Sequence, residues 1–283
     1  MRYCSLASGS SGNCHYVEAG GACVLVDIGI SLKAAEANMY SVGLDPSKVQ
    51  AVFVTHEHSD HVKGIGAFVR KYQIPVFATE GTWQGMQKAL GRIALPRCYT
   101  IRAGHGYRLA NMRIQPFLTY HDANEPVGYQ ITAEEHKLII LTDTGMVSDE
   151  MRMLAQGADI VIAESNHDPE MLMNGPYPAA LKHRIRSNLG HLSNVDCGFL
   201  LSDVFASNPY CQTLLAHLSE DNNTPEIAWR TVLGVLYDRL GPADYRVGVA
   251  PRNEPSAVLS PLRQSVPAPQ TVPVPQAGEG GQP

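Results

Sequence analysis

The stretch Thr55-His56-Glu57-His58-Ser59-Asp60-His61 decides how the rest of the sequence is interpreted. Its three histidines and one aspartate directly follow the apolar run Val52-Phe53-Val54, which predicts a buried strand that ends in a loop. Imidazole nitrogens and carboxylate oxygens are the ligands that zinc and similar divalent ions take. The stretch therefore predicts a metal site at a strand end. The alternative is a solvated polar turn in which Ser59 or Asp60 caps the next helix, and capping is compatible with ligation.

Length and composition narrow the class of protein. The chain has 283 residues, which is compatible with one large α/β domain. Its net charge of −5 gives no global attraction for nucleic acid, so any such contact must come from a local basic patch. The segment Met1–Leu6 lacks the apolar core of a signal peptide, and no apolar run has the length of a membrane span. The six cysteines show no CxxC spacing, so we expect reduced thiols, a cytoplasmic protein and no membrane partner.

The C-terminal part differs in composition from the rest. From about Pro251 the chain is rich in Pro, Gln and Gly and has no apolar periodicity. Such a segment buries too little surface to offset its chain entropy. We therefore expect one domain over residues 1–250 and a disordered Pro-rich tail over residues 251–283, with a docking role for the tail as the alternative.

The order of the expected elements predicts the fold class. Strands are expected at residues 1–6, 13–18, 22–27, 50–55, 75–78, 98–102, 106–110, 112–120, 126–132, 136–142, 159–163, 213–216 and 245–249. Helices are expected at residues 31–43, 62–72, 80–90, 148–156, 195–206 and 225–240. Strand–helix alternation, then a strand meander, then alternation again indicates an α/β fold with two mixed sheets packed face to face and helices outside.

Further residues that can bind metal follow apolar strands elsewhere in the sequence. His121 follows residues 117–120, Asp143 follows residues 138–142, and His217 follows residues 213–216. Each is a weak signal alone, because an aspartate before a glycine usually marks a turn. Together with the first cluster they indicate further parts of one site. Asp27 ends another strand, either as a partner that orients a ligand histidine or as a turn residue.

These motifs resemble those of the metallo-β-lactamase superfamily. The pattern His56-x-His58-x-Asp60-His61, followed by His121, Asp143 and His217, matches its ligand order over nearly all of residues 1–250. The strings at residues 5–13, 141–145, 190–194 and 217–219 are similar to those of the YycJ/WalJ group, which is related to tRNase Z and RNase J. The resemblance implies a four-layer αββα sandwich with the site along one edge.

The resemblance also implies a dinuclear centre. One metal ion would bind His56, His58 and His121, the second would bind Asp60, His61 and His217, and Asp143 would bridge both. Zn²⁺ or Mn²⁺ suits these ligands, and Fe²⁺ is also compatible. Two such ions lower the pKa of a bound water, which Asp60 would orient and deprotonate. His191 would donate a proton to the leaving oxygen or contact the phosphate, with a solvent-facing histidine at a helix start as the alternative.

Several polar residues are candidates for substrate contacts. Asn166 and His167 follow the expected strand at 159–163, and Ser219 follows His217 closely. A basic patch precedes His191 and consists of Lys182, Arg184 and Arg186. A polyanionic substrate needs such a patch beside the reaction centre of an acidic protein. The alternatives are ordinary loop chemistry for the first three residues and a solvated helix face for the patch.

The resemblance favours a metal-dependent phosphodiesterase that acts on nucleic acid, DNA rather than RNA, as a DNA exonuclease. The sequence has no long arm of the tRNase Z kind and no inserted domain of the RNase J kind. A small-substrate acyl hydrolase on the same fold (a thioesterase, lactonase or β-lactamase) is the alternative, although His191 and the basic patch favour the nuclease. A non-hydrolytic di-iron protein is a third class, and it usually has glutamate where His58 stands.

Overall fold

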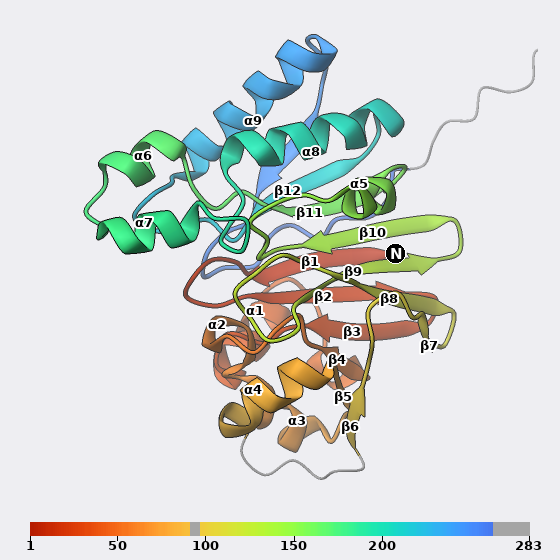
Figure 1. Ribbon diagram of the computed structural model, residues 1–283. Coiled ribbons are helices and arrows are strands. Elements are labelled where there is room, and N and C mark those ends of the chain that lie inside the picture. The colour runs from red at the N-terminus through yellow and green to blue at the C-terminus, as the bar shows by residue number, and fades with distance from the viewer. Residues whose placement is uncertain (91–96, 263–283) are drawn as a thin grey trace, which may run out of the picture.

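The computed structural model describes residues 1–90 and 97–262. Two β-sheets pack face to face, and helices cover both outer faces (Figure 1). This arrangement confirms the predicted four-layer αββα sandwich. Within the described residues, no helix combines the length and the apolar character needed to cross a membrane.

The first sheet has six strands in the order β1-β2-β3-β4-β5-β6. They are β1 (Arg2–Ala7), β2 (Cys14–Ala19), β3 (Ala22–Val26), β4 (Ala51–Phe53), β5 (Val76–Ala78) and β6 (Cys98–Thr100). The first three strands pair antiparallel, and β3 to β6 pair in parallel. Parallel neighbours need a crossover. The crossovers contain α1 (Leu32–Ser41), η1 (Pro46–Lys48), α2 (Ser59–Val62), α3 (Ile65–Tyr72) and α4 (Glu80–Leu90).

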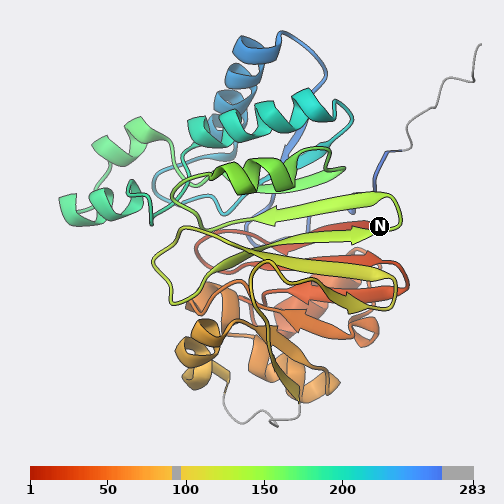
Figure 2. The ribbon, with the colours of Figure 1, turned by 45° about the vertical axis from the view of Figure 1, so that its right-hand side comes forward.

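The second sheet has seven strands in the order β13-β12-β11-β10-β9-β8-β7. They are β7 (Tyr107–Leu109), β8 (Met112–Leu118), β9 (Val127–Ala133), β10 (His136–Leu141), β11 (Ile160–Glu164), β12 (Gln212–Ala216) and β13 (Arg246–Val249). The meander β7 to β10 is antiparallel, and β10 to β13 are parallel. Its helices are α5 (Asp149–Ala155), α6 (Pro169–Asn174), α7 (Ala179–Ile185), α8 (Asn194–Ser207) and α9 (Pro225–Leu240). Figure 2 shows them on the side of the molecule opposite to α1–α4.

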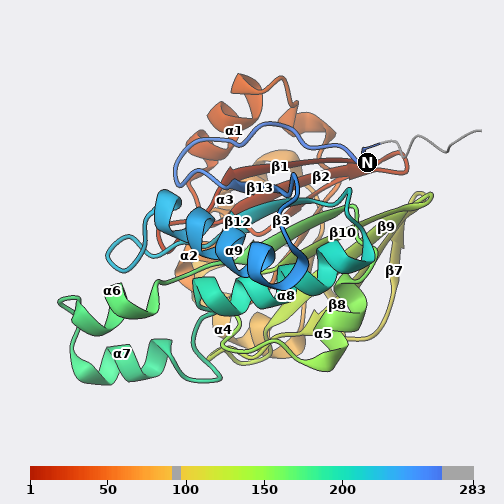
Figure 3. The same cartoon turned by 90° about the horizontal axis from the view of Figure 1, so that it is seen from above.

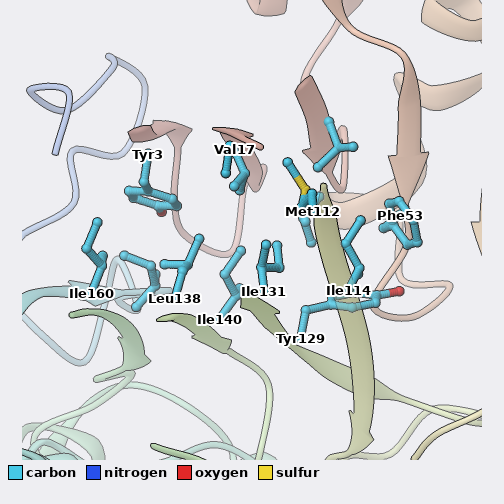
Figure 4. Packing of buried hydrophobic residues seen from close by; sticks show 14 of the residues in the cluster. Tyr3, Val17, Phe53, Met112, Ile114, Tyr129, Ile131, Leu138, Ile140 and Ile160 are labelled. Carbon is cyan, nitrogen blue, oxygen red and sulfur yellow. The ribbon is translucent and has the colours of Figure 1, made fainter. Parts of the chain in front are cut away.

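The main hydrophobic core lies between the two sheets (Figure 4). Tyr3 and Val17 from the first sheet face Ile131, Leu138 and Ile140 from the second, and all five are buried. Successive side chains of each strand point to opposite faces of its sheet. The sheet faces turned away from the main core form two outer cores under the helices. The sandwich therefore holds its strand ends in fixed positions along one edge.

One expected helix begins later in the structure. The helix expected at 62–72 is α3, which begins at Ile65; the separate short helix α2 ends at Val62, with Lys63 and Gly64 between the two. A Cβ atom at Gly64 would lie 2.0 Å from the carbonyl oxygen of Ile30. The close approach of these two segments therefore requires glycine at this position and fixes the chain directly after the histidine cluster.

A short helical hairpin, α6–α7, was not expected as such from the sequence. Figure 3 shows both helices projecting beyond the rest of the molecule. Leu172 is the buried residue of α6, and α7 has none among its seven residues. An apolar stripe is the signal from which a helix is predicted, so the sequence carried little trace of this hairpin.

Residues 251–262, which the composition assigned to the tail, are placed against the sandwich. The backbone N–H of Ser256 donates to Ser5 (2.8 Å), and Leu259 exchanges two backbone hydrogen bonds with Tyr3 (2.8 and 2.9 Å). We call residues 251–262 the strap. The Pro-rich composition hid this pairing because the strap adds backbone hydrogen bonds rather than an apolar pattern. The rest of the expected tail, residues 263–283, lies outside the described residues.

Candidate metal centre

The segments that follow four strands, including the short helix α2 after β4, bring the expected metal ligands together. His56 to His61 follow β4, His121 follows β8, Asp143 follows β10 and His217 follows β12. Asp143 and His217 have left-handed backbone conformations, with φ of 58° and 54°. This region is uncommon for residues other than glycine and tends to occur where function requires a fixed side-chain direction.

The first group of ligands consists of His56, His58 and His121. One ligand atom from each lies within 4.8 Å of the others. Nε2 of His121 is 3.2 Å from Nδ1 of His58. Nε2 of His56 is buried and has no hydrogen-bond partner. A buried polar atom without a partner costs free energy, so this atom fits a metal ligand better than a structural histidine.

The second group consists of Asp60, His61 and His217, whose ligand atoms also lie within 4.8 Å of one another. Oδ2 of Asp60 is 3.5 Å from Nε2 of His61 and 3.3 Å from Nε2 of His217. Asp143 lies between the two groups. Its carboxylate oxygens are 3.3 Å from His61, 3.4 Å from His217 and 3.8 Å from His121. Its Oδ2 is buried without a hydrogen-bond partner, which fits a bridging ligand.

The electrostatics of the site favour positive charge. Burial lowers the pKa of His217, but the carboxylates of Asp143, Asp60 and Glu164 outweigh burial and raise it to about 10. Burial also lowers the pKa of His61, but Asp143 and Asp27 outweigh burial and raise this pKa well above its usual value. Carboxylates placed so closely must hold either protons or metal cations. The donor set and its charge therefore fit divalent metal ions.

Partners behind the ligands fix their orientation. Oδ2 of Asp27 is 2.8 Å from Nδ1 of His61, and its two carboxylate oxygens accept hydrogen bonds from the backbone N–H and hydroxyl of Thr55. Nδ1 of His121 donates to the carbonyl oxygen of Gly190 at 2.9 Å. Such contacts set the ring orientation and tautomer of a ligand histidine. Asp27 thus has the orienting contact that was one of its two expected roles.

Glu164 is a residue of the site that sequence reasoning missed. It ends β11, is fully buried, and has Oε1 at 2.7 Å from Nδ1 of His191 and 3.2 Å from Nδ1 of His217. Its Oε2 accepts from the backbone N–H of Thr144 (2.8 Å). The signal was the one used for Asp143, an acidic residue at the end of a buried strand.

His191 reaches the site from the loop before α8. Its side chain is 20 % exposed, and its ring centroid is 4.9 Å from that of His121 and 5.3 Å from that of His217. The ring therefore lies between ligands of both groups while one side faces solvent. This position fits a contact with substrate and not an ordinary surface histidine.

The six candidates for substrate contacts divide into those that line a hollow beside His191 and those that do not. A hollow of about 160 Å³ beside His191 is lined by Asn166, Arg184 and Ser219, together with Ser10 and Tyr177. His167, Lys182 and Arg186 are not among its lining residues. His167 is buried, and burial lowers its pKa to about 4. The structure thus brings three of the six candidates to the site.

The basic patch is tied to neighbouring groups. Arg184 forms an ion pair with Asp122, next to His121. Nζ of Lys182 donates to the carbonyl oxygen of Met173 (2.8 Å), and Arg186 contacts Sδ of the same methionine (3.1 Å). Lys182 therefore helps to close the α6–α7 hairpin, while Arg184 places its charge at the mouth of the hollow.

Comparison with known proteins agrees with this geometry. Residues 23–207 match the family model described as a beta-lactamase superfamily domain. The chain is 41% identical over 239 residues, 84% of its length and 90% of the relative's, to an exodeoxyribonuclease YycJ of Bacillus anthracis. It is 38% identical over 251 residues, 88% of its length and 91% of the relative's, to an exodeoxyribonuclease WalJ of Streptococcus pneumoniae.

A solved structure shares the fold. The metallo-beta-lactamase fold protein YhfI of Bacillus subtilis superposes with a TM-score of 0.67 at 16% identity, covering 90% of this chain and 98% of that one. At this identity the similarity shows the fold alone. The family is shown by the two relatives with 41% and 38% sequence identity. The chain therefore belongs to the metallo-β-lactamase superfamily and, within it, to the family of the YycJ and WalJ proteins.

Proposed function

We propose that this protein is a metal-dependent phosphodiesterase that removes nucleotides from an end of DNA. The observation that carries the proposal is the convergence of two ligand groups on the Asp143 carboxylate, with His191 alongside. The names of the Bacillus anthracis and Streptococcus pneumoniae relatives support DNA and an exonucleolytic reaction. We also propose cytoplasmic residence, which the buried free thiols of Cys4, Cys14 and Cys197 support.

We assign the ligands as two sets with one shared residue. His56, His58 and His121 would hold one divalent ion, and Asp60, His61 and His217 would hold the other. Asp143 would be shared by both, and the all-nitrogen-and-oxygen donor set suits Zn²⁺ or Mn²⁺, with Fe²⁺ also compatible. When bound, such ions lower the pKa of a water and neutralise charge on a phosphate oxygen.

The chain's own groups complete the reaction centre. Asp60 would orient the attacking water, since its side chain lies beside His61 and His217 and is 21 % exposed. His191 donates a proton or hydrogen bond from Nε2 to the leaving oxygen, because Glu164 engages its Nδ1. Arg184 and Ser219 line the hollow beside His191 and would contact the phosphate. Asn166 donates to the carbonyl oxygen of His217 (2.9 Å) and so holds that loop in place.

The test offers several substrates to one preparation. Protein loaded with Zn²⁺ or Mn²⁺ receives end-labelled double- and single-stranded DNA, RNA, a bis-aryl phosphodiester and a cephalosporin. We expect DNA to be shortened from an end. Activity on the cephalosporin or a thioester alone would reject the nuclease in favour of an acyl hydrolase.

Two variants test the ligand assignment in the same assay. We expect His58→Ala and Asp143→Ala to abolish DNA cleavage and to lower the number of metal ions bound per chain, measured by elemental analysis. His105→Ala is the matched control, because His105 is exposed and its Nδ1 contacts the carbonyl oxygen of Ala103 in its own turn. Full metal content and full cleavage in Asp143→Ala would contradict the bridging role.

A further inference from the structure

A second, larger cavity lies beyond the loop that carries His191. Its volume is about 720 Å³, and its walls include Arg152 of α5, Phe199 of α8, Arg239 of α9 and Arg186 of the loop. We call it the arginine cavity. None of these four residues is a metal ligand or lines the hollow beside His191. Arg186 belongs to the same loop as His191. The volume is large enough for a nucleotide, whereas the hollow at the metal centre, about 160 Å³, is not.

The charges in the arginine cavity are arranged around one carboxylate. Oδ2 of Asp203 is 2.5 Å from Arg152, and its Oδ1 is 3.9 Å from Arg239. Asp196 also lines the cavity, but its carboxylate accepts from the hydroxyl of Ser193 (2.6 Å). Three guanidinium groups thus face two carboxylates that already have partners. A guanidinium has five N–H donors, so the arginines keep donors for phosphate oxygens.

An aromatic side chain provides a surface for a base. Phe199 is 37% exposed although α8 is otherwise rich in buried apolar residues. The guanidinium of Arg239 lies 5.4 Å from its ring centroid. Aromatic rings and guanidinium planes are both surfaces on which unpaired bases stack. The pair therefore combines base stacking with a charge for the neighbouring phosphate.

The cavity and the metal centre share a wall. Ile185, Gly190 and His191 face the hollow at the metal centre, while Arg186, Asn188 and Leu192 face the arginine cavity. In Figures 1 and 3, α7 projects near one end of α8 and α5 lies beside the other part of α8. A strand that crosses the 185–192 loop can therefore occupy both spaces at once.

We propose that the arginine cavity binds the single-stranded nucleic acid that adjoins the nucleotide being removed. One base packs on Phe199 and Arg239, and Arg152 and Arg186 contact the phosphates on either side. This assignment rests on the proposed nuclease function and adds a path for the substrate strand. It predicts a preference for longer substrates, because a small phosphodiester reaches the metal centre without entering the cavity.

The test measures binding and turnover separately in the full chain. A fluorescein-labelled oligodeoxythymidylate of about 12 nucleotides is titrated by anisotropy in EDTA, where no cleavage occurs. We expect Phe199→Leu and Arg239→Gln each to weaken its binding about tenfold, the effect of losing one stacked base. Turnover of a bis-aryl phosphodiester by the metal-loaded variants should stay at the wild-type rate. Arg230→Gln is the matched control on α9, since Arg230 pairs with Glu226 away from the cavity.

The outcomes separate this inference from the proposed function. Wild-type affinity for the oligonucleotide in both variants overturns the cavity assignment, even if the protein cleaves DNA. Equal losses of oligonucleotide binding and of small-substrate turnover also overturn it, because the residues would then act through the metal centre. Oligonucleotide binding that depends on Phe199 and Arg239, without cleavage by metal-loaded wild type, supports the cavity and rejects the nuclease.

Discussion

Glu164 is a single buried carboxylate that orders two histidines of the site. It lies within 2.7 Å of His191 and 3.2 Å of His217, and it is fully buried. Burial raises the pKa of Glu164, but the interactions with His191 and His217 outweigh burial and lower the pKa below its usual value, so the group stays ionised in the fold. Its charge and its acceptors therefore fix which nitrogen of each ring faces the reaction centre.

We expect Glu164→Gln to lower kcat about 10- to 100-fold, because the uncharged amide no longer fixes the tautomer of His191. The measurement is the turnover of DNA and of a bis-aryl phosphodiester by metal-loaded protein. Glu18→Gln is the control, since that carboxylate pairs with Arg2 at the surface. A wild-type kcat in Glu164→Gln would show that His191 works without an orienting partner.

His15 makes the fold sensitive to acid. It is fully buried, and burial lowers its pKa from 6.5 to about 3. Because the folded pKa is the lower one, the unfolded chain binds the extra proton, and stability falls as the pH drops from about 6.5 towards 3. His15 is 2.8 Å from the hydroxyl of Tyr3, which a glutamine can also contact.

We expect His15→Gln to reduce this acid loss by up to about 1.4 kcal/mol for each pH unit, the value for one proton. Urea unfolding of metal-free protein at several pH values between 7 and 4 measures the slope. The comparison with wild type removes the contribution of the metal ligands, which titrate in both proteins. Parallel slopes would mean that His15 is not responsible for the acid sensitivity.

At the scale of elements, sequence patterns identified most strands and helices but not their breaks. The helices expected at 80–90 and 225–240 have the bounds of α4 and α9. The break at Gly64 depends on contact with Ile30, and such a contact between distant segments leaves no periodicity. The hairpin α6–α7 was not predicted because Leu172 is the one buried residue of its two helices. Local pattern predicts an element, and tertiary contact decides where it ends.

The strap was not predicted from the composition, and its contribution to the free energy of unfolding can be measured. It forms backbone hydrogen bonds with β1 at Tyr3 and Ser5, and the carbonyl oxygen of Arg252 accepts from Ser8. Four such bonds contribute about 2–4 kcal/mol. We therefore expect a chain that ends at residue 250 to lose about this much free energy of unfolding relative to a chain that ends at residue 262.

Urea unfolding of the two shortened chains measures the difference. The chain that ends at residue 262 is the control for the loss of the Pro-rich segment alone. Ser8 also accepts from the backbone N–H of His217 (2.9 Å), so removal of the strap should weaken metal binding as well. Equal stability of the two chains would show that the strap contributes nothing to the sandwich.

At the scale of the whole molecule, the candidate site was predictable because every ligand follows a strand. Parallel strands of one sheet end at the same edge, which brings Asp143 and His217 together although they lie 74 positions apart in the sequence (217 − 143). Distances and outer partners were not predictable. The arginine cavity requires the packing of α5, α8 and α9, which no local pattern contains.

Charge is the last property that belongs to the whole molecule. The net charge of −5 repels DNA, so binding must depend on the few cations near the site. Arg186 has Met173 Sδ as its contact, while Lys182 and Arg184 are engaged by a carbonyl oxygen and a carboxylate. We expect Lys182→Ser, Arg184→Ser and Arg186→Ser together to weaken DNA binding and to flatten its salt dependence. The slope of log Kd against log salt should fall by about one to two, less than three contacts would give.

Anisotropy titrations in EDTA at several salt concentrations measure this slope. The matched control changes Arg102, Arg108 and Arg113 to serine, three exposed arginines on and before the β7–β8 hairpin. Both triple variants have the same net charge, so a general electrostatic effect would alter their slopes equally. A smaller slope only in the 182/184/186 variant locates phosphate contacts at the hollow beside His191 or, through Arg186, in the arginine cavity. An unchanged slope there would leave the basic patch as a solvated helix face, with the acidic molecule binding DNA through other cations.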